Sequence, residues 1–206
     1  MPDQPTNHDP RSDFWRRHFE AAVDYEAYLA TSEPRHAGRW REMEAKLPPL
    51  SPEQAARLAR NTRAMNVLVY TGVWCGDCVR QGPIIHRLCD AAGPEVEDRY
   101  IDREASAALK DELRLVGAER VPVVVFCTED FFEVGRFGDR TLGAYRRKAR
   151  REVGPACDLG LPPPPDEMAA ELSEWLDTFE RMLLMLRLPP TSAPVTETEV
   201  PTSGAW

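Results

Sequence analysis

The sequence contains no apolar run near the ~20 residues that a membrane span needs. Residues 1–12 are polar, so we expect no secretory signal there and take the cytoplasm as the expected location. Basic residues are the minority: the formal net charge is −8, which argues against sequence-independent nucleic-acid binding by the whole chain. A length of 206 residues indicates one domain with additions, or two small domains.

Cysteine is sparse, but two cysteines share the stretch Trp-Cys-Gly-Asp-Cys at positions 74–78. An apolar run at 67–70 precedes it, so the pair is predicted where a strand ends and a helix begins. At a helix N-terminus, unpaired N–H groups and the helix dipole lower the pKa of a thiol such as Cys75. Cys78 lies one turn further on. We therefore expect thiol–disulfide exchange, with Cys75 attacking and Cys78 resolving.

The residues around the two thiols are expected to modulate them. A negative charge at Asp77 should raise the pKa of Cys75 and make the couple more reducing. Alternatively, Asp77 only complements the positive end of the helix. Trp74 is expected to be half exposed and to cover one flank of the thiols, and Gly76 completes the motif.

A metal site is the competing interpretation, because Cys75, Cys78, His86 and Cys89 resemble zinc-ligand spacing on paper. In one helix, Cys78 and Cys89 would lie about 16 Å apart along the axis, at ~1.5 Å per residue. Zinc binds thiolates at ~2.3 Å, so one ion cannot bridge them. We expect no metal and no bound cofactor. Cys89 and Cys127 are expected to be inert core thiols.

Residues 51–152 have the pattern of an α/β core in the order helix, strand, helix, strand, helix, strand, strand, helix. Strands are expected at 66–71, 96–101, 121–127 and 131–137, and helices at 52–64, from the cysteines to 92, at 105–115 and at 141–152. Ser51 as cap, Pro52 at the first helical position and Gln54 three residues after Ser51 predict the start of the first helix. The last of these helices is rich in basic residues. A solvated face is the simpler interpretation, and docking to an acidic partner or to the acidic arms is the alternative.

The flanking segments divide into four parts. Residues 1–50 are predicted to form a tail and a helical arm, with a helix over 13–29 and a second after Pro34. Residues 153–165 are proline-rich and predict a stiff linker that carries Cys157. A helix is expected over 166–188, followed by a disordered tail at 189–206.

Apolar residues in the 166–188 helix step by four and three alternately, which is typical of a coiled-coil seam. Three heptads are short for an independent coiled coil. We expect this helix to dock onto the N-terminal helices of the same chain. A homodimer through the seam is the second interpretation.

In its core the chain resembles the thioredoxin family. The Trp-Cys-Gly-Asp-Cys stretch resembles the family's active site, and Pro83 matches the proline that kinks its helix. Val121-Pro122 resembles the family's cis-proline, and Gly138 its glycine beside the substrate groove. The resemblance implies a three-layer fold with a mixed sheet of about four strands over 51–152, plus extra terminal helices. Val121, Pro122 and Gly138 would then line the substrate groove.

Two positions depart from the family pattern. Val69 stands where thioredoxin has a buried acid that assists proton transfer to the resolving thiol. This chain must therefore use water, another acid or a slower step. Asp77 replaces a proline, as in a smaller related group that acts on a restricted set of disulfides.

The expected function is a disulfide reductase that draws electrons from a separate reductase or a small thiol. Its substrates would be disulfide-containing proteins or small-thiol disulfides, with neither nucleic acid nor membrane as a partner. The alternative is a thioredoxin-like binding or redox-sensing module. Access to Cys75 past the helical arms separates the two interpretations.

Overall fold

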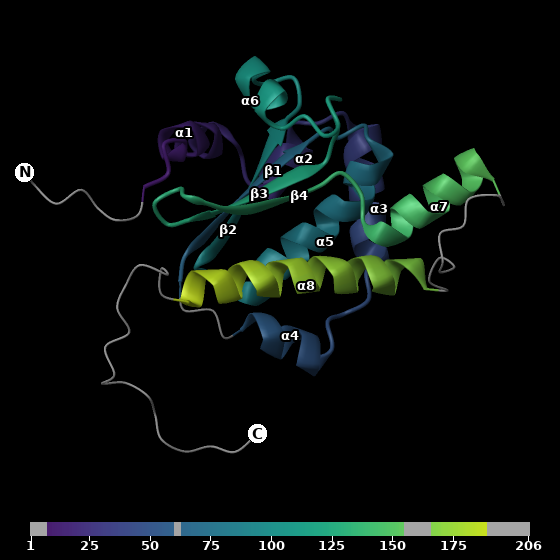
Figure 1. Cartoon of the computed structure of the whole chain (residues 1–206). Coiled ribbons are helices and arrows are strands. Elements are labelled where there is room, and N and C mark those ends of the chain that lie inside the picture. The colour runs from purple at the N-terminus through teal and green to yellow at the C-terminus, as the bar shows by residue number, and fades with distance from the viewer. Residues whose placement is uncertain (1–7, 60–62, 155–165, 189–206) are drawn as a thin grey trace, which may run out of the picture.

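The computed structural model describes residues 8–59, 63–154 and 166–188, which form a four-stranded mixed sheet flanked by helices (Figure 1). The strand order is β2-β1-β3-β4, with β1 parallel to β2 and the other neighbours antiparallel. The α/β thioredoxin-like fold expected from the sequence is confirmed. The strands are β1 (Met65–Thr71), β2 (Val96–Asp102), β3 (Val123–Thr128) and β4 (Glu133–Gly138).

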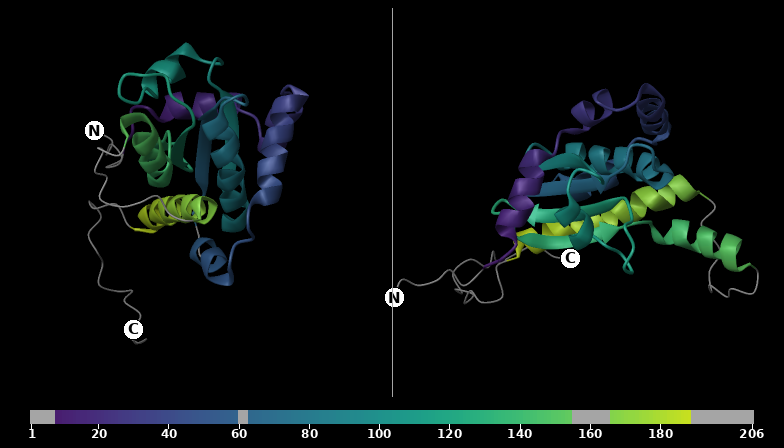
Figure 2. Two further views of the ribbon diagram at one scale, coloured as in Figure 1. Left: turned by 90° about the vertical axis from the view of Figure 1, so that its right-hand side faces the viewer. Right: turned by 90° about the horizontal axis from the view of Figure 1, so that it is seen from above.

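Successive side chains of β4 point to opposite faces of the sheet, and their contacts show which helices cover each face. Phe137 faces α8 (Glu167–Arg187), where its ring centroid lies 4.7 Å from that of Trp175. Arg136 points to the opposite face, where its guanidinium lies over the Trp15 ring of α1 (Ser12–Ala21). On that face Arg136 also pairs with the last residue of α6 (Ala107–Glu112). Helix α5 (Gly76–Ala92) contacts both β2 and α8, so these two helices share one layer (Figure 2).

The single helix predicted over 13–29 is wrong, because the chain breaks between α1 and α2 (Tyr25–Ala30). Val23 pairs there with Tyr100 on the outer edge of β2, with N–H···O distances of 3.1 and 2.7 Å. The edge strand needs partners for its backbone groups, and this bridge supplies them. Asp24 then restarts the helix as its N-cap, accepting from the Ala27 N–H at 2.7 Å.

Helix α3 (Pro34–Lys46) packs against α5 through Trp40, which is fully buried. The Trp40 ring lies so close to Gly82 that a methyl group on Gly82 would come within 2.0 Å of it. Helix α4 (Pro52–Leu58) begins with the predicted capping box, in which Ser51 and Gln54 exchange hydrogen bonds. The arm is therefore packed onto the core.

The expected role of residues 141–152 as the last core helix is corrected by the structure. Helix α7 (Leu142–Val153) has no buried residue and extends beyond the sheet (Figure 1). The place in the layer beside α5 is taken by α8, whose apolar seam is buried against α5, β4 and α4. We expected α8 to dock onto the N-terminal helices; it contacts α4 among them and otherwise packs on α5 and β4. The face that a dimer seam requires is therefore used within the chain. The buried seam residues are Leu172, Trp175, Leu176, Phe179, Met182, Leu183 and Leu186.

Some predictions fall outside the described residues: the tail over residues 1–7, the linker at 155–165 with Cys157, and the tail at 189–206. Within the described residues, no helix is both long and apolar enough to span a membrane.

Candidate functional site

The two cysteines of the motif lie at the start of α5, in different surroundings. Cys75 is the N-cap of the helix, with φ −75° and ψ 127°, and its carbonyl accepts from the Val79 N–H at 2.9 Å. Its side chain is half-buried, whereas Cys78 is fully buried. Both cysteines are free thiols. One sulfur therefore faces the exterior and the other faces the core.

This asymmetry separates the pKa values of the two thiols. A hydrogen bond from Cys78, opposed by burial and aided by the backbone N–H groups of Cys78 and Asp77, lowers the pKa of Cys75 to about 6. Burial, together with the neighbouring Cys75, raises the pKa of Cys78 well above its usual range. At neutral pH Cys75 is mostly thiolate and Cys78 is protonated. That is the charge state that a nucleophile and its resolving thiol require.

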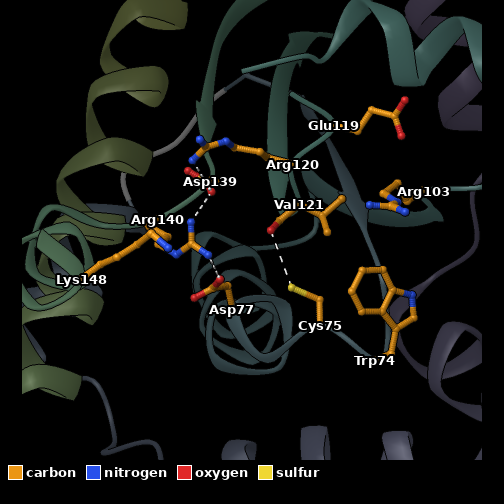
Figure 3. Close-up of a pocket in the computed structure, with 10 residues that line it drawn as sticks. All are labelled: Trp74, Cys75, Asp77, Arg103, Glu119, Arg120, Val121, Asp139, Arg140 and Lys148. Atoms are coloured by element: carbon orange, nitrogen blue, oxygen red, sulfur yellow. Dashed lines mark hydrogen bonds and ion pairs between the residues drawn. The ribbon is translucent and has the colours of Figure 1, made fainter. Parts of the chain in front are cut away.

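The loop before β3 lies opposite Cys75 (Figure 3). The Cys75 Sγ is 3.7 Å from the carbonyl oxygen of Val121, and the Val121–Pro122 peptide bond is cis. Gly138 lies behind this loop: a Cβ there would approach the Pro122 carbonyl oxygen to 2.7 Å. Only glycine fits this close backbone approach without displacing the loop.

Cys75 opens into a surface pocket of about 290 Å³ that is lined by four cationic and three acidic side chains (Figure 3). Trp74 forms one wall with 47% of its surface exposed, and the Arg103 guanidinium lies 5.2 Å from its ring centroid. The pocket as a whole has no excess of negative charge, although the chain does. The charged lining residues are Arg103, Arg120, Arg140, Lys148, Asp77, Glu119 and Asp139.

Asp77 does not act alone on Cys75, because Arg140 pairs with it at 2.5 Å. The charge of Asp77 raises the pKa of Cys75, but its effect is smaller than each of the contributions named above. Arg140 also pairs with Asp139, whose backbone carbonyl accepts from Gln81 at 2.9 Å. The Trp175 indole of α8 donates to the same Gln81 at 3.1 Å. Sequence patterns gave no signal for this network, because its members are far apart in the chain.

The helical arm holds the loop that leads into the motif. The Trp40 indole donates to the Val73 carbonyl at 3.0 Å, and Arg39 donates to the Trp74 carbonyl at 3.4 Å. These contacts fix the backbone just before Cys75. They leave the sulfur itself in the open pocket.

The other thiols and the candidate zinc ligand take structural positions. Cys89 and Cys127 are buried, and burial raises the pKa of each thiol. His86 hydrogen-bonds Asp98 at 2.9 Å and stacks on Tyr25. In the described ranges no three His, Cys, Asp or Glu side chains are grouped as metal ligands.

The comparisons with known proteins concern the fold and the family. A protein of unknown function from Pseudomonas aeruginosa, PA1234, is 21% identical, with a TM-score of 0.62 over 82% of this chain and 96% of that one. An HIV epitope-scaffold is also 21% identical, with a TM-score of 0.57 over 84% of this chain and 97% of that one. No curated protein sequence matches. A thioredoxin family model matches residues 22–145, more than half of the chain, and the chain therefore belongs to the thioredoxin family.

Proposed function

We propose that the protein is a thiol–disulfide oxidoreductase that reduces disulfides through the Cys75/Cys78 couple. The observation that carries this proposal is the unequal pair of thiols: Cys75 is accessible and its pKa is about 6, whereas Cys78 is buried beside it. A purely structural pair of cysteines would have no need of a lowered pKa on the exposed sulfur.

In the proposed reaction the Cys75 thiolate attacks one sulfur of a substrate disulfide, and the other sulfur leaves as a thiolate. Cys78 then loses its proton and attacks the Cys75 sulfur of the mixed disulfide. The Cys75–Cys78 bond forms, and the second substrate thiolate is released. Two electrons pass from the dithiol to the substrate. A separate reductase or a small thiol returns them, and we propose the cytoplasm as a compartment reducing enough for this cycle.

We propose that the substrate lies along the loop opposite Cys75. The Val121 carbonyl faces the attacking sulfur, and Gly138 packs against the Pro122 carbonyl behind this loop. An extended substrate segment would pair with this backbone as an added strand, while the Trp74 ring covers its flank. Backbone pairing favours unfolded or loop disulfides over buried ones.

The test is reduction of a disulfide-bonded peptide with dithiothreitol as electron donor. We expect Cys75→Ser to abolish turnover, and Cys78→Ser to stop at a mixed disulfide that mass spectrometry detects on Cys75. Cys89→Ser is the matched control, because it changes another buried thiol of the same helix and should leave turnover intact. Absence of turnover, with no partner captured by Cys78→Ser in cells, would favour the binding or redox-sensing module instead.

A further inference from the structure

The resolving step requires Cys78 to lose a proton, because only a thiolate attacks a disulfide sulfur. Cys78 is fully buried, so this proton has no direct path to solvent. Val69, on the strand before the motif, is fully buried and apolar and cannot accept it. The described part of the chain has two buried carboxylates, Asp139 and Glu171. Each is paired with arginine side chains and is therefore committed elsewhere.

Thr71 is placed to receive this proton. It is two residues after Val69 on β1, so both side chains point to the same face of the sheet, the face covered by α5. Thr71 is fully buried, and its hydroxyl has no partner with full hydrogen-bond geometry. The hydroxyl nevertheless lies within interaction range of the Cys78 thiol and of the Tyr28 hydroxyl.

Tyr28 continues the path outward from Thr71. It comes from α2 and packs between Trp40 and Tyr100, with ring centroids 5.7 Å from each. Only 6% of its surface is exposed, and its hydroxyl, like that of Thr71, has no partner with full hydrogen-bond geometry. The backbone N–H of Val73 lies within interaction range of the same hydroxyl. Yet Tyr28 lines a surface pocket of about 360 Å³, which Asp102 lines as well. Asp102 is the register partner of Thr71 on β2, so its side chain stands on the same face.

We propose that the hydroxyls of Thr71 and Tyr28 form a proton relay from the Cys78 thiol to the pocket beside Asp102. The inference rests on the proposed reductase function and assigns its resolving step. Buried hydroxyls without partners destabilise a fold, and each needs an explanation. A proton relay explains both hydroxyls, because a hydroxyl that must accept one proton and donate another cannot be committed to a permanent partner.

During resolution the S–H bond of Cys78 breaks and Thr71 accepts that proton. Thr71 passes its own hydroxyl proton to Tyr28, and Tyr28 releases its phenolic proton to a water molecule in the pocket, beside the Asp102 carboxylate. The Cys78 thiolate forms a bond to the Cys75 sulfur, and the bond from Cys75 to the substrate breaks. The substrate thiolate leaves with the electron pair. Reversal of the relay returns the proton when the disulfide is reduced again.

The experiment separates the two steps with an aromatic disulfide reagent that releases a coloured thiolate. With one equivalent of the reagent per protein, the attack by Cys75 releases the first coloured thiolate, and the attack by Cys78 on the mixed disulfide releases the second. The full chain is used with Cys157→Ser, which removes a thiol outside the described residues. We expect Thr71→Val to leave the first phase unchanged and to slow the second on the order of 100-fold, the lower end for a positioned proton-transfer group. Tyr28→Phe should slow the same phase, and Thr71→Ser, which keeps the hydroxyl, should restore it.

A stability measurement distinguishes the relay from a structural role. Thr71→Val replaces an unpartnered hydroxyl by a methyl group, so urea unfolding should show equal or higher stability while resolution slows. With Thr71 and Tyr28 in place, the second phase should also carry a solvent deuterium isotope effect. An unchanged second phase in both Thr71→Val and Tyr28→Phe would overturn the relay. Absence of any second release from the chain that carries only Cys157→Ser would instead overturn the reductase function itself.

Discussion

The low pKa of Cys75 should depend mainly on the hydrogen bond from Cys78, because this is the largest of its causes. Cys78→Ala removes the donor, and Cys78→Ser keeps a donor at the same position. Hydrogen bonds to charged groups are worth about 1.5–3 kcal/mol, which corresponds to roughly 1–2 pKa units. From its value of about 6, the pKa of Cys75 should therefore rise to about 7–8 in Cys78→Ala. In Cys78→Ser it should change little.

The assay is the rate of alkylation of Cys75 as a function of pH, in a Cys157→Ser background. Cys89 and Cys127 are buried and should react slowly. The midpoint of the profile is the quantity to compare, since thiolates of higher pKa are intrinsically more nucleophilic and absolute rates partly compensate. At pH 6 half of the unsubstituted Cys75 should be thiolate, against about 1–10% in Cys78→Ala.

Two results would refute this reasoning. If Cys78→Ala kept its midpoint near 6, the backbone N–H groups at the helix start would account for the lowered pKa by themselves. If Cys78→Ser moved the midpoint as far as Cys78→Ala, the thiol would act through its own chemistry and not as a hydrogen-bond donor.

Further predictions concern stability. Gly82→Ala should destabilise the fold by about 1–3 kcal/mol in urea unfolding, because the added methyl group overpacks against Trp40. Gly38→Ala is the control: a methyl group there meets nothing within 4 Å, so its effect should be neutral or stabilising. Equal effects of the two substitutions would contradict the close helix contact. The free energy of unfolding of the reduced protein should rise with pH from about 6 to about 8.5, because Cys75 ionises in the folded chain before it does in the unfolded chain. This contribution is lost as pH falls through about 6, and its absence from the difference between the unsubstituted chain and Cys75→Ser would contradict the lowered pKa.

Local signals were sufficient where one segment decides its own structure. The apolar run before the cysteines predicted β1, which the structure extends by one residue, and Ser51 with Gln54 predicted the start of α4. The break at Val23 was missed because the helical periodicity continues across it. Only the neighbouring edge of β2 makes an extended residue favourable there.

The sequence by itself determined the elements of the core and put two thiols at a strand–helix boundary, since apolar periodicity and capping act within a few residues. Tertiary structure decided that α8 and not α7 completes the layer beside α5, because amphipathic spacing shows that a face is buried but not what it contacts. It also decided that Arg140 pairs with Asp77, 63 residues away. In the same way it placed Tyr28 of the arm beside Thr71, because only folding brings such distant side chains within interaction range.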